Sequence, residues 1–286
     1  MSEILWLASY PKSGNTWLRI FLENLLGRDD HVADINDLRV TEYAGTRRVF
    51  DNLVGLEASD LTPSEVERYR TEVYRILAEK SSRALLIKAH DAYTCQRGGE
   101  PLFPSDVSRG VVYILRNPLD VAVSFANHYK RSIDSAITRM GNETAVVSGE
   151  PDCLSKQLRQ RIGSWSSHVL SWTGQTSIPV HVLRYEDMIS QPLSAFGATS
   201  RFAGLETNEE ALATAIAACS FDRLQTQERE FGFRERLRAS QVFFRQGQVG
   251  GWRSVLTPLQ VDRILTKHGE VMRRFGYLSE SGEINA

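Results

Sequence analysis

The chain has 286 residues, of which 42% are hydrophobic and 24% charged, as is usual for a globular protein. Its 34 Lys and Arg residues nearly balance 35 Asp and Glu, so the net charge of −1 argues against a broad nucleic-acid-binding surface. Three widely spaced cysteines, Cys95, Cys153 and Cys219, favour neither a disulfide framework nor a cysteine-rich zinc site. With no run of the roughly 20 apolar residues that a membrane span needs, and no signal-peptide pattern, a cytoplasmic protein is expected.

Short apolar runs separated by helical patterns predict an alternation of strands and helices. The strands are expected at residues 4–9, 84–88, 111–115 and 180–183. The helices are expected around residues 17–25, from 62 to 80, from 117 onward, over 154–172 and 209–218, and from 257 to about 276. The second and the last of these helices begin at a Thr-Pro pair, in which Thr caps the helix and Pro takes its first position.

This alternation predicts a single α/β domain over residues 1–286, with a central parallel sheet flanked by helices. Most of the expected strands are apolar on both faces, which suits a parallel sheet covered by helices on both sides. Residues 133–153 and 225–246 are polar and weakly periodic, so they are expected to form mobile loops or short helices near a site.

Residues 9–17 connect the first expected strand to the first helix and read Ser-Tyr-Pro-Lys-Ser-Gly-Asn-Thr-Trp. At such a place the helix N-terminus offers unpaired N–H groups and the positive end of its dipole to an anion. Gly14 allows a close backbone approach, and Lys12 adds a positive charge. Ser13 and Thr16 add hydroxyl donors. The segment therefore predicts a P-loop-like loop for a phosphate-type group, although the first Gly of a nucleotide P-loop is missing and Lys precedes the second.

This loop resembles the 5′-phosphosulfate loop of sulfotransferases that use 3′-phosphoadenosine 5′-phosphosulfate (PAPS). Its Gly-Asn-Thr-Trp form is most similar to bacterial members, including those that sulfate glycopeptide antibiotics. Further matches follow in family order as far as Trp252. The resemblance implies transfer of the sulfuryl group from PAPS to a hydroxyl or phenol of a small molecule or natural product, with release of 3′-phosphoadenosine 5′-phosphate (PAP). It implies no metal.

Lys88 and His90, at the end of the second expected strand, match a Lys-x-His of the family in which the His is the general base. A His with its ordinary pKa near 6.5 suits proton removal close to neutral pH. From the residues alone, a capping or surface His is an equal alternative. The resemblance implies a catalytic set of His90, Lys12 and Lys88, with the two lysines stabilising charge on the leaving phosphate and at the sulfuryl group.

Residues 113–124 resemble the family's 3′-phosphate motif. Arg116 follows the third expected strand, and its guanidinium offers a fork of donors that fits phosphate. Ser124 lies two turns into the next helix, whereas Asp120 is expected to cap that helix. Residues 184–188 contain Tyr185, which matches a residue at the adenine end of the cofactor.

Two later segments complete the resemblance. Residues 219–221 match a segment whose aromatic residue packs on adenine, with an ordinary core role for Phe221 nearly as favoured. Residues 244–253 resemble the late glycine-rich motif, but Gln246 replaces a Lys and Gly251 an Asp, which predicts a weaker hold on the nucleotide. The cofactor-binding residues implied by all matches are Lys12, Ser13, Gly14, Asn15, Thr16, Trp17, Arg116, Ser124, Tyr185, Phe221, Arg245, Gln246 and Gly247.

Two alternative functions stay open at this point. A P-loop-like kinase or hydrolase acting on a magnesium nucleotide would share the Lys12 loop, and a non-catalytic PAP or nucleotide sensor would share the fold. The acceptor site is expected among four variable loops, at residues 39–60, 91–108, 133–153 and 225–246. Aromatic residues there could form an apolar cleft: Phe50, Tyr93, Phe103, Phe231 and Phe233. Neither nucleic acid nor a membrane is expected as a partner, and a homodimer is left open.

Overall fold

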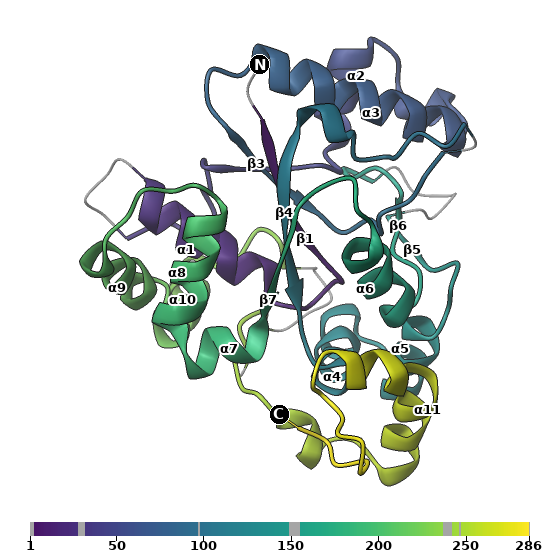
Figure 1. Cartoon of the computed structure of the whole chain (residues 1–286), viewed down its shortest axis with the longest axis vertical. Coiled ribbons are helices and arrows are strands. Elements are labelled where there is room, and N and C mark those ends of the chain that lie inside the picture. Colours follow the sequence, from purple (N-terminus) through teal and green to yellow (C-terminus); the bar gives the residue numbers. More distant parts are fainter. Residues whose placement is uncertain are drawn as a thin grey trace. The chain divides into compact units, whose positions relative to one another are not determined.

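The computed structural model describes residues 3–27, 32–96, 98–148, 155–236, 242–245 and 247–285. It contains a five-stranded sheet with the strand order β2-β3-β1-β4-β7. Of these strands, β1, β3, β4 and β7 are labelled in Figure 1. The strands are β1 (Ile4–Ser9), β2 (Thr41–Tyr43), β3 (Leu85–Ala89), β4 (Ser108–Leu115) and β7 (Val180–Arg184). β1 pairs in parallel with β3, with Leu5 opposite Leu86 and Leu7 opposite Lys88. The strands β5 (Val146–Val147) and β6 (Gln160–Arg161) form a separate antiparallel pair.

The predicted α/β fold with a parallel sheet is confirmed, because all four expected strands form close to their expected bounds. Every residue of β1 is buried, as its unbroken apolar run indicates. β2 was not predicted, since three residues with the sequence Thr-Glu-Tyr carry no apolar pattern. The strand order places β3 on one side of β1 and β4 on the other, and open sheets of this kind bind ligands where the strand order reverses.

Eleven helices are found in the described residues. They are α1 (Asn15–Leu26), α2 (Arg47–Val54), α3 (Pro63–Lys80), α4 (Pro118–Tyr129), α5 (Ile133–Met140), α6 (Trp165–Gly174), α7 (Tyr185–Ser190), α8 (Pro192–Phe202), α9 (Glu209–Ala218), α10 (Phe221–Phe231) and α11 (Pro258–Arg274). Single 3₁₀ turns lie at Ala58–Asp60, Ser105–Val107 and Gly251–Ser254. Thr62 and Thr257 cap α3 and α11 through capping boxes, as the Thr-Pro pairs predict.

The helix predicted over residues 154–172 is wrong in its first part. Residue 154 lies outside the described residues, and β6 occupies two of the following positions. Gly163 has a φ of 60°, outside the helical range, and Ser164 then caps α6 with a capping box to Ser167. The helix therefore begins only at Trp165. The segments expected to be loops or short helices do contain short helices, α5 and the end of α10.

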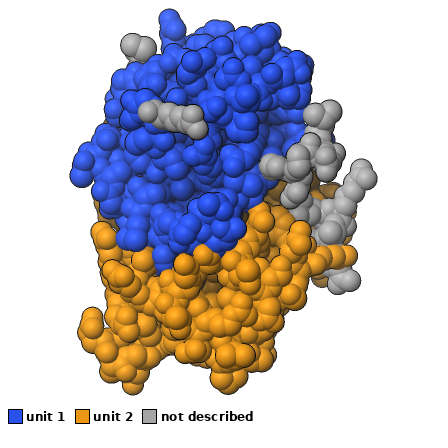
Figure 2. Space-filling model, turned by 90° about the vertical axis from the view of Figure 1, so that its right-hand side faces the viewer, with its two compact units in different colours: residues 1–10, 42–113, 142–182 blue, residues 11–41, 114–141, 183–286 orange. Residues whose placement is uncertain are grey.

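The chain divides into two compact units, each coloured separately in Figure 2. The first unit comprises residues 1–10, 42–113 and 142–182, and the second comprises residues 11–41, 114–141 and 183–286. In the first, Trp6 packs edge-on against Tyr74 and Phe103 at ring distances of 4.9 and 4.8 Å. In the second, α11 packs on α4 and α5, and α1 packs on α9. Among the described helices, none combines the length and apolar character needed to cross a membrane.

Candidate functional site

The predicted phosphate-type loop turns sharply into α1. Gly14 caps this helix with a φ of 107°, and its carbonyl accepts hydrogen bonds from the amides of Trp17 and Leu18. No side-chain hydrogen bond caps the helix, and the N-terminus of a helix suits an anionic ligand. Lys12 has a φ of 73°, which is uncommon for a residue other than glycine. Lys12 and Gly14 thus both have a positive φ, a conformation that residues other than glycine rarely adopt.

The rings expected at the adenine end all belong to the second unit, and those of Trp17 and Tyr185 lie together. Gly14 packs so closely on Tyr185 that an added Cβ would lie 2.6 Å from the Tyr185 Cδ2 atom. The ring of Trp17 lies 5.8 Å from that of Tyr185, and its Nε1 donates to the carbonyl of Cys219 at 3.0 Å. Phe221 follows two residues later and packs against Gly247, where an added Cβ would lie 2.3 Å from a ring carbon. These contacts join four of the predicted sequence segments.

Arg116 connects the phosphate-type loop to the late glycine-rich segment. Its guanidinium donates to the carbonyls of Lys12 at 3.3 Å and Gln248 at 3.2 Å, and it lies 4.0 Å from the centre of the Tyr185 ring. Two buried donors here have no hydrogen-bond partner among the described residues, the Nε of Arg116 and the hydroxyl of Ser13. Buried polar groups are nearly always hydrogen-bonded. These orphaned donors therefore fit an anionic ligand such as the two ends of PAPS.

Lys12 points at an aromatic ring in the same unit. Its Nζ lies 3.8 Å from the centre of the Phe243 ring, a cation–π contact. The backbone amides of Phe243 and Phe244 donate to the buried carboxylate of Glu228, at 2.7 and 2.8 Å. Arg245 is exposed, and Gln246 lies outside the described residues.

Asp120 has a role that the sequence did not indicate. A capping role in α4 was predicted, but its carboxylate accepts hydrogen bonds from the backbone amides of Gly250 at 2.8 Å and Trp252 at 3.0 Å. It is buried, so these charge-assisted bonds fix the late glycine-rich segment to the start of α4. The residue lies four positions from Arg116 and four from Ser124, which is half-buried on the same helix.

We expect Asp120→Asn to weaken PAP binding about tenfold. An amide keeps one acceptor oxygen but turns an NH₂ group toward the second backbone amide, and a hydrogen bond to a charged group contributes roughly 1.5–3 kcal/mol. Calorimetric titration with PAP checks this, with Asp134→Asn on the exposed face of α5 as the matched control. Equal PAP affinity in the wild type and Asp120→Asn would contradict the positioning role.

Glu186 links the segments of Arg116 and Tyr185 and has a structural role. Its buried carboxylate accepts from the amide of Asn117 at 2.9 Å and from the hydroxyl of Tyr277 at 2.7 Å. Burial raises the pKa of this carboxyl, and the two hydrogen bonds act in the opposite direction. The side chain of Asn117 also caps α4 by accepting a hydrogen bond from the amide of Leu119.

The predicted base, His90, lies in the first unit at the end of β3. Its Nδ1 lies 2.9 Å from the carbonyl oxygen of Ser9 and 3.3 Å from the Ser9 hydroxyl. Because a carbonyl can only accept, Nδ1 carries the proton in this contact and Nε2 keeps its lone pair. Lys88 is buried two residues earlier, with its Nζ 4.9 Å from the centre of the Tyr43 ring. The ring of Tyr43 lies 6.3 Å from that of His90.

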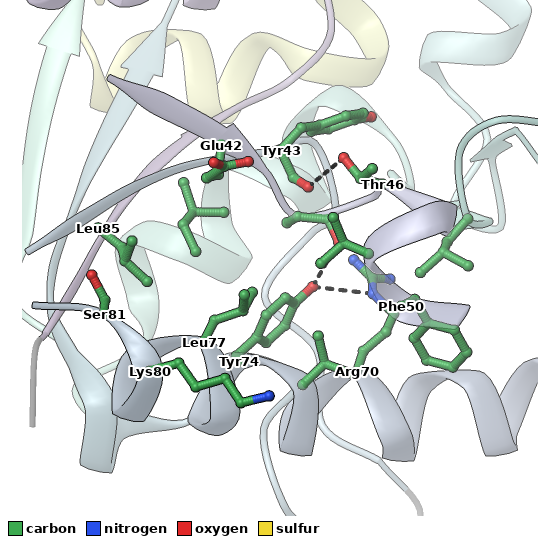
Figure 3. A pocket seen from close by; sticks show the side chains of 15 residues that line it. Glu42, Tyr43, Thr46, Phe50, Arg70, Tyr74, Leu77, Lys80, Ser81 and Leu85 are labelled. Carbon is green, nitrogen blue, oxygen red and sulfur yellow. Dashed lines mark hydrogen bonds between the residues drawn. The ribbon is translucent and has the colours of Figure 1, made fainter. Parts of the chain in front are cut away.

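A cavity of about 280 Å³ lies between β2, β3, α2 and α3 in the first unit (Figure 3). Its apolar lining includes Val49, Phe50, Val73, Leu77, Leu85 and Ile87. Lys88 and His90 do not line it, but Tyr43 does.

The other aromatic residues predicted to form an acceptor cleft lie elsewhere. Phe103 packs in the core against Trp6, and Tyr93 stacks on it at 6.3 Å. Phe233 is buried and lies 4.7 Å from the ring of Phe243, whereas Phe231 is 73% exposed.

A model of the sulfotransferase domain matches residues 2–276. The chain belongs to the sulfotransferase family. Cytosolic sulfotransferase 5 of Arabidopsis thaliana is 29% identical over 271 residues, covering 90% of this chain and 76% of the relative. Flavonol 3-sulfotransferase of Flaveria bidentis is 24% identical over 276 residues, covering 91% and 78%.

Solved structures share the fold of this sulfotransferase. Mouse sulfotransferase SULT7A1 complexed with PAP superimposes with a TM-score of 0.60 at 21% identity, covering 95% of this chain and 85% of that one. Retinol dehydratase in complex with androsterone and PAP gives a TM-score of 0.64 at 16% identity, covering 99% and 82%. The protein is a PAPS-dependent sulfotransferase, with PAPS as its cosubstrate and PAP as its nucleotide product. This decides against the kinase-like alternative.

Proposed function

We propose that this enzyme transfers the sulfuryl group to a hydroxyl or phenol of a small molecule, with His90 as the general base. The observation that carries the proposal is the 2.9 Å contact between the His90 Nδ1 and the Ser9 carbonyl, which leaves Nε2 as the proton acceptor. In the in-line displacement, the acceptor oxygen bonds to sulfur as the bond from sulfur to the 5′-phosphate oxygen breaks. The acceptor proton goes to Nε2.

The residues of the second unit fit the two anionic ends of the cosubstrate. The loop amides, the Ser13 hydroxyl and the Lys12 ammonium suit the 5′-phosphosulfate end. Arg116, Ser124, Arg245 and the amide of Gly247 suit the 3′-phosphate. The adenine would lie among Trp17, Tyr185 and Phe221. When bound, PAPS supplies an activated sulfuryl group with PAP as the leaving group. Lys12 and Lys88 would stabilise the charge that grows there.

The acceptor is proposed to be an apolar small molecule that bears a hydroxyl. Relatives support this class, since one is named a flavonol 3-sulfotransferase and retinol dehydratase was solved with androsterone. The resemblance to bacterial enzymes that sulfate glycopeptide antibiotics extends the proposal to natural products. Within the first unit, Tyr43 contacts both the apolar cavity and the Lys88–His90 pair, which favours an aromatic or alicyclic acceptor body beside it. Relatives named cytosolic sulfotransferases support the predicted cytoplasmic location.

The test begins with calorimetric binding of PAP and of ADP, each with and without Mg²⁺. Both nucleotides carry two phosphates, but ADP has its second phosphate on the 5′ side instead of at the 3′ position, so their difference in affinity measures the pocket assigned to Arg116, Ser124 and Arg245. Charge-assisted hydrogen bonds contribute roughly 1.5–3 kcal/mol each, so PAP should bind about 100-fold more tightly, independently of Mg²⁺. Sulfuryl transfer from PAPS to a panel of phenols, flavonols and sterols then identifies the acceptor. Equal binding of PAP and ADP, or binding that requires Mg²⁺, would refute the assignment.

A further inference from the structure

A second histidine, His168, contacts the backbone of His90. It is fully buried on α6, with its Nε2 3.0 Å from the His90 carbonyl oxygen and its Nδ1 2.8 Å from the hydroxyl of Tyr113. A carbonyl can only accept, so Nε2 carries the proton and Nδ1 accepts from the Tyr113 hydroxyl. Burial lowers the pKa of His168 to about 4, so its ring is neutral at physiological pH.

These contacts close into a ring of hydrogen bonds. The Tyr113 hydroxyl oxygen is hydrogen-bonded to the backbone N–H of Tyr10, which belongs to the same peptide bond as the Ser9 carbonyl. That carbonyl accepts from the Nδ1 of His90. The path runs from His90 through the Ser9–Tyr10 peptide, Tyr113 and His168, and back to the His90 carbonyl. Each member accepts a hydrogen bond from the member before it and donates one to the member after it. Hydrogen bonds in such a chain strengthen one another.

The direction of the ring determines the tautomer of His90. The Nδ1 must donate for the ring to close, so the proton lies on Nδ1 and the lone pair on Nε2. Were the proton on Nε2, the Nδ1 lone pair would face the lone pairs of the Ser9 carbonyl. The ring also joins the strand end that carries His90 to the first residue of the phosphate-type loop.

Two more residues on the same face of α6 hold the backbone that follows His90. The Nε1 of Trp172 donates to the carbonyl of Asp91 at 3.0 Å, and the hydroxyl of Ser171 accepts from the amide of Tyr93 at 3.0 Å. Residues three and four positions apart lie on one face of a helix, which is why one helix reaches backbone groups of residues 90, 91 and 93.

We propose that His168 and Tyr113 are positioning residues that hold His90 as the Nδ1–H tautomer through this ring. The inference rests on the proposed role of His90 as general base, and it adds how the base is kept in its reactive form. Neither residue is assigned a contact with the reacting atoms, and both act through the backbone groups that flank the His90 ring.

The experiment compares His168→Leu, His168→Gln and Tyr113→Phe with the control Val169→Ala, which truncates a buried residue of the same helix that is not in the ring. The Nε2 of a glutamine can still donate to the His90 carbonyl. With PAPS and 4-nitrophenol, kcat should fall about tenfold or more in His168→Leu and less in Tyr113→Phe, and His168→Gln should recover part of it. PAP affinity should stay within about threefold of the wild type. Val169→Ala should lower the melting temperature and leave kcat unchanged.

A spectroscopic reading keeps the test independent of turnover. In ¹⁵N-histidine spectra, the nitrogen shifts of the His90 ring report which nitrogen carries the proton. The wild type should show the Nδ1–H tautomer, and His168→Leu and Tyr113→Phe should show a rising share of Nε2–H. An unchanged His90 tautomer and unchanged kcat in both variants would overturn the inference, as would a kcat loss that tracks the melting temperature equally in Val169→Ala. Should His168→Leu fail to fold, Tyr113→Phe tests the inference instead, because it removes only the hydroxyl and keeps the volume of the aromatic side chain. Normal turnover in a His90→Ala enzyme would refute the general-base role, whereas the tautomer measurement would still judge the ring.

Discussion

Replacing His90 by alanine is expected to abolish most turnover and leave nucleotide binding intact. A positioned general base commonly contributes 10²–10⁴-fold to the rate. The contact of the His90 Nδ1 with the Ser9 carbonyl supports the proposal that His90 is such a base. The residues assigned to PAP all lie in the second unit, whereas His90 lies in the first. We therefore expect the kcat for 4-nitrophenol with PAPS to fall at least about 100-fold, with the Kd for PAP unchanged within about threefold.

The measurement pairs steady-state kinetics with calorimetric titration of PAP. His181→Ala is the matched control, since it removes a half-buried histidine from β7, away from the end of β3. Turnover of His90→Ala within a few-fold of the wild type would remove His90 from the mechanism. A parallel loss of PAP binding would instead show that the variant disturbs the fold around the nucleotide.

Those parts of the site that lie within one chain segment could be predicted from the sequence. The loop around Gly14 and the Arg116 motif each combine a strand end, a helix start and their polar residues in about ten successive positions, so local patterns reveal them. The structure brings Arg116, Tyr185 and Trp17 together with the loop, as their predicted roles require. Their contacts with PAPS stay predictions.

Contacts between distant segments could not be predicted. Asp120 carries a typical helix-start signature, and nothing local indicates that its carboxylate binds amides 130 residues later. Likewise, the ring through Tyr113 and His168 depends on side chains 55 residues apart that meet in the core. The short strand β2 and the late start of α6 were missed because pairing partners and a left-handed glycine, rather than apolar periodicity, determine them.

Breaking the ion pair between Arg70 and Asp91 is expected to destabilise the fold more than any surface substitution. The two side chains are 1% and 2% exposed, and their two hydrogen bonds measure 2.6 and 3.0 Å. Removal of one partner leaves a buried charge uncompensated, which costs roughly 3–5 kcal/mol. For a chain of this size that lowers the melting temperature by about 10 °C. Arg70→Met and Asp91→Asn should each show this loss in thermal unfolding.

A double-mutant cycle separates the pair from simple loss of packing. Arg70→Met combined with Asp91→Asn removes both charges, so its loss of stability should be clearly smaller than the sum of the single losses. Arg75→Met is the matched control, because Arg75 lies on the same helix and pairs with Glu72, Glu100 and Asp106, but its side chain is 31% exposed. Such pairs contribute about 1 kcal/mol or less. If Arg70→Met and Arg75→Met melted at the same temperature, burial would not determine the strength of the pair. Because Asp91 directly follows His90, the measured loss of stability also reports how strongly α3 holds the backbone next to the proposed base.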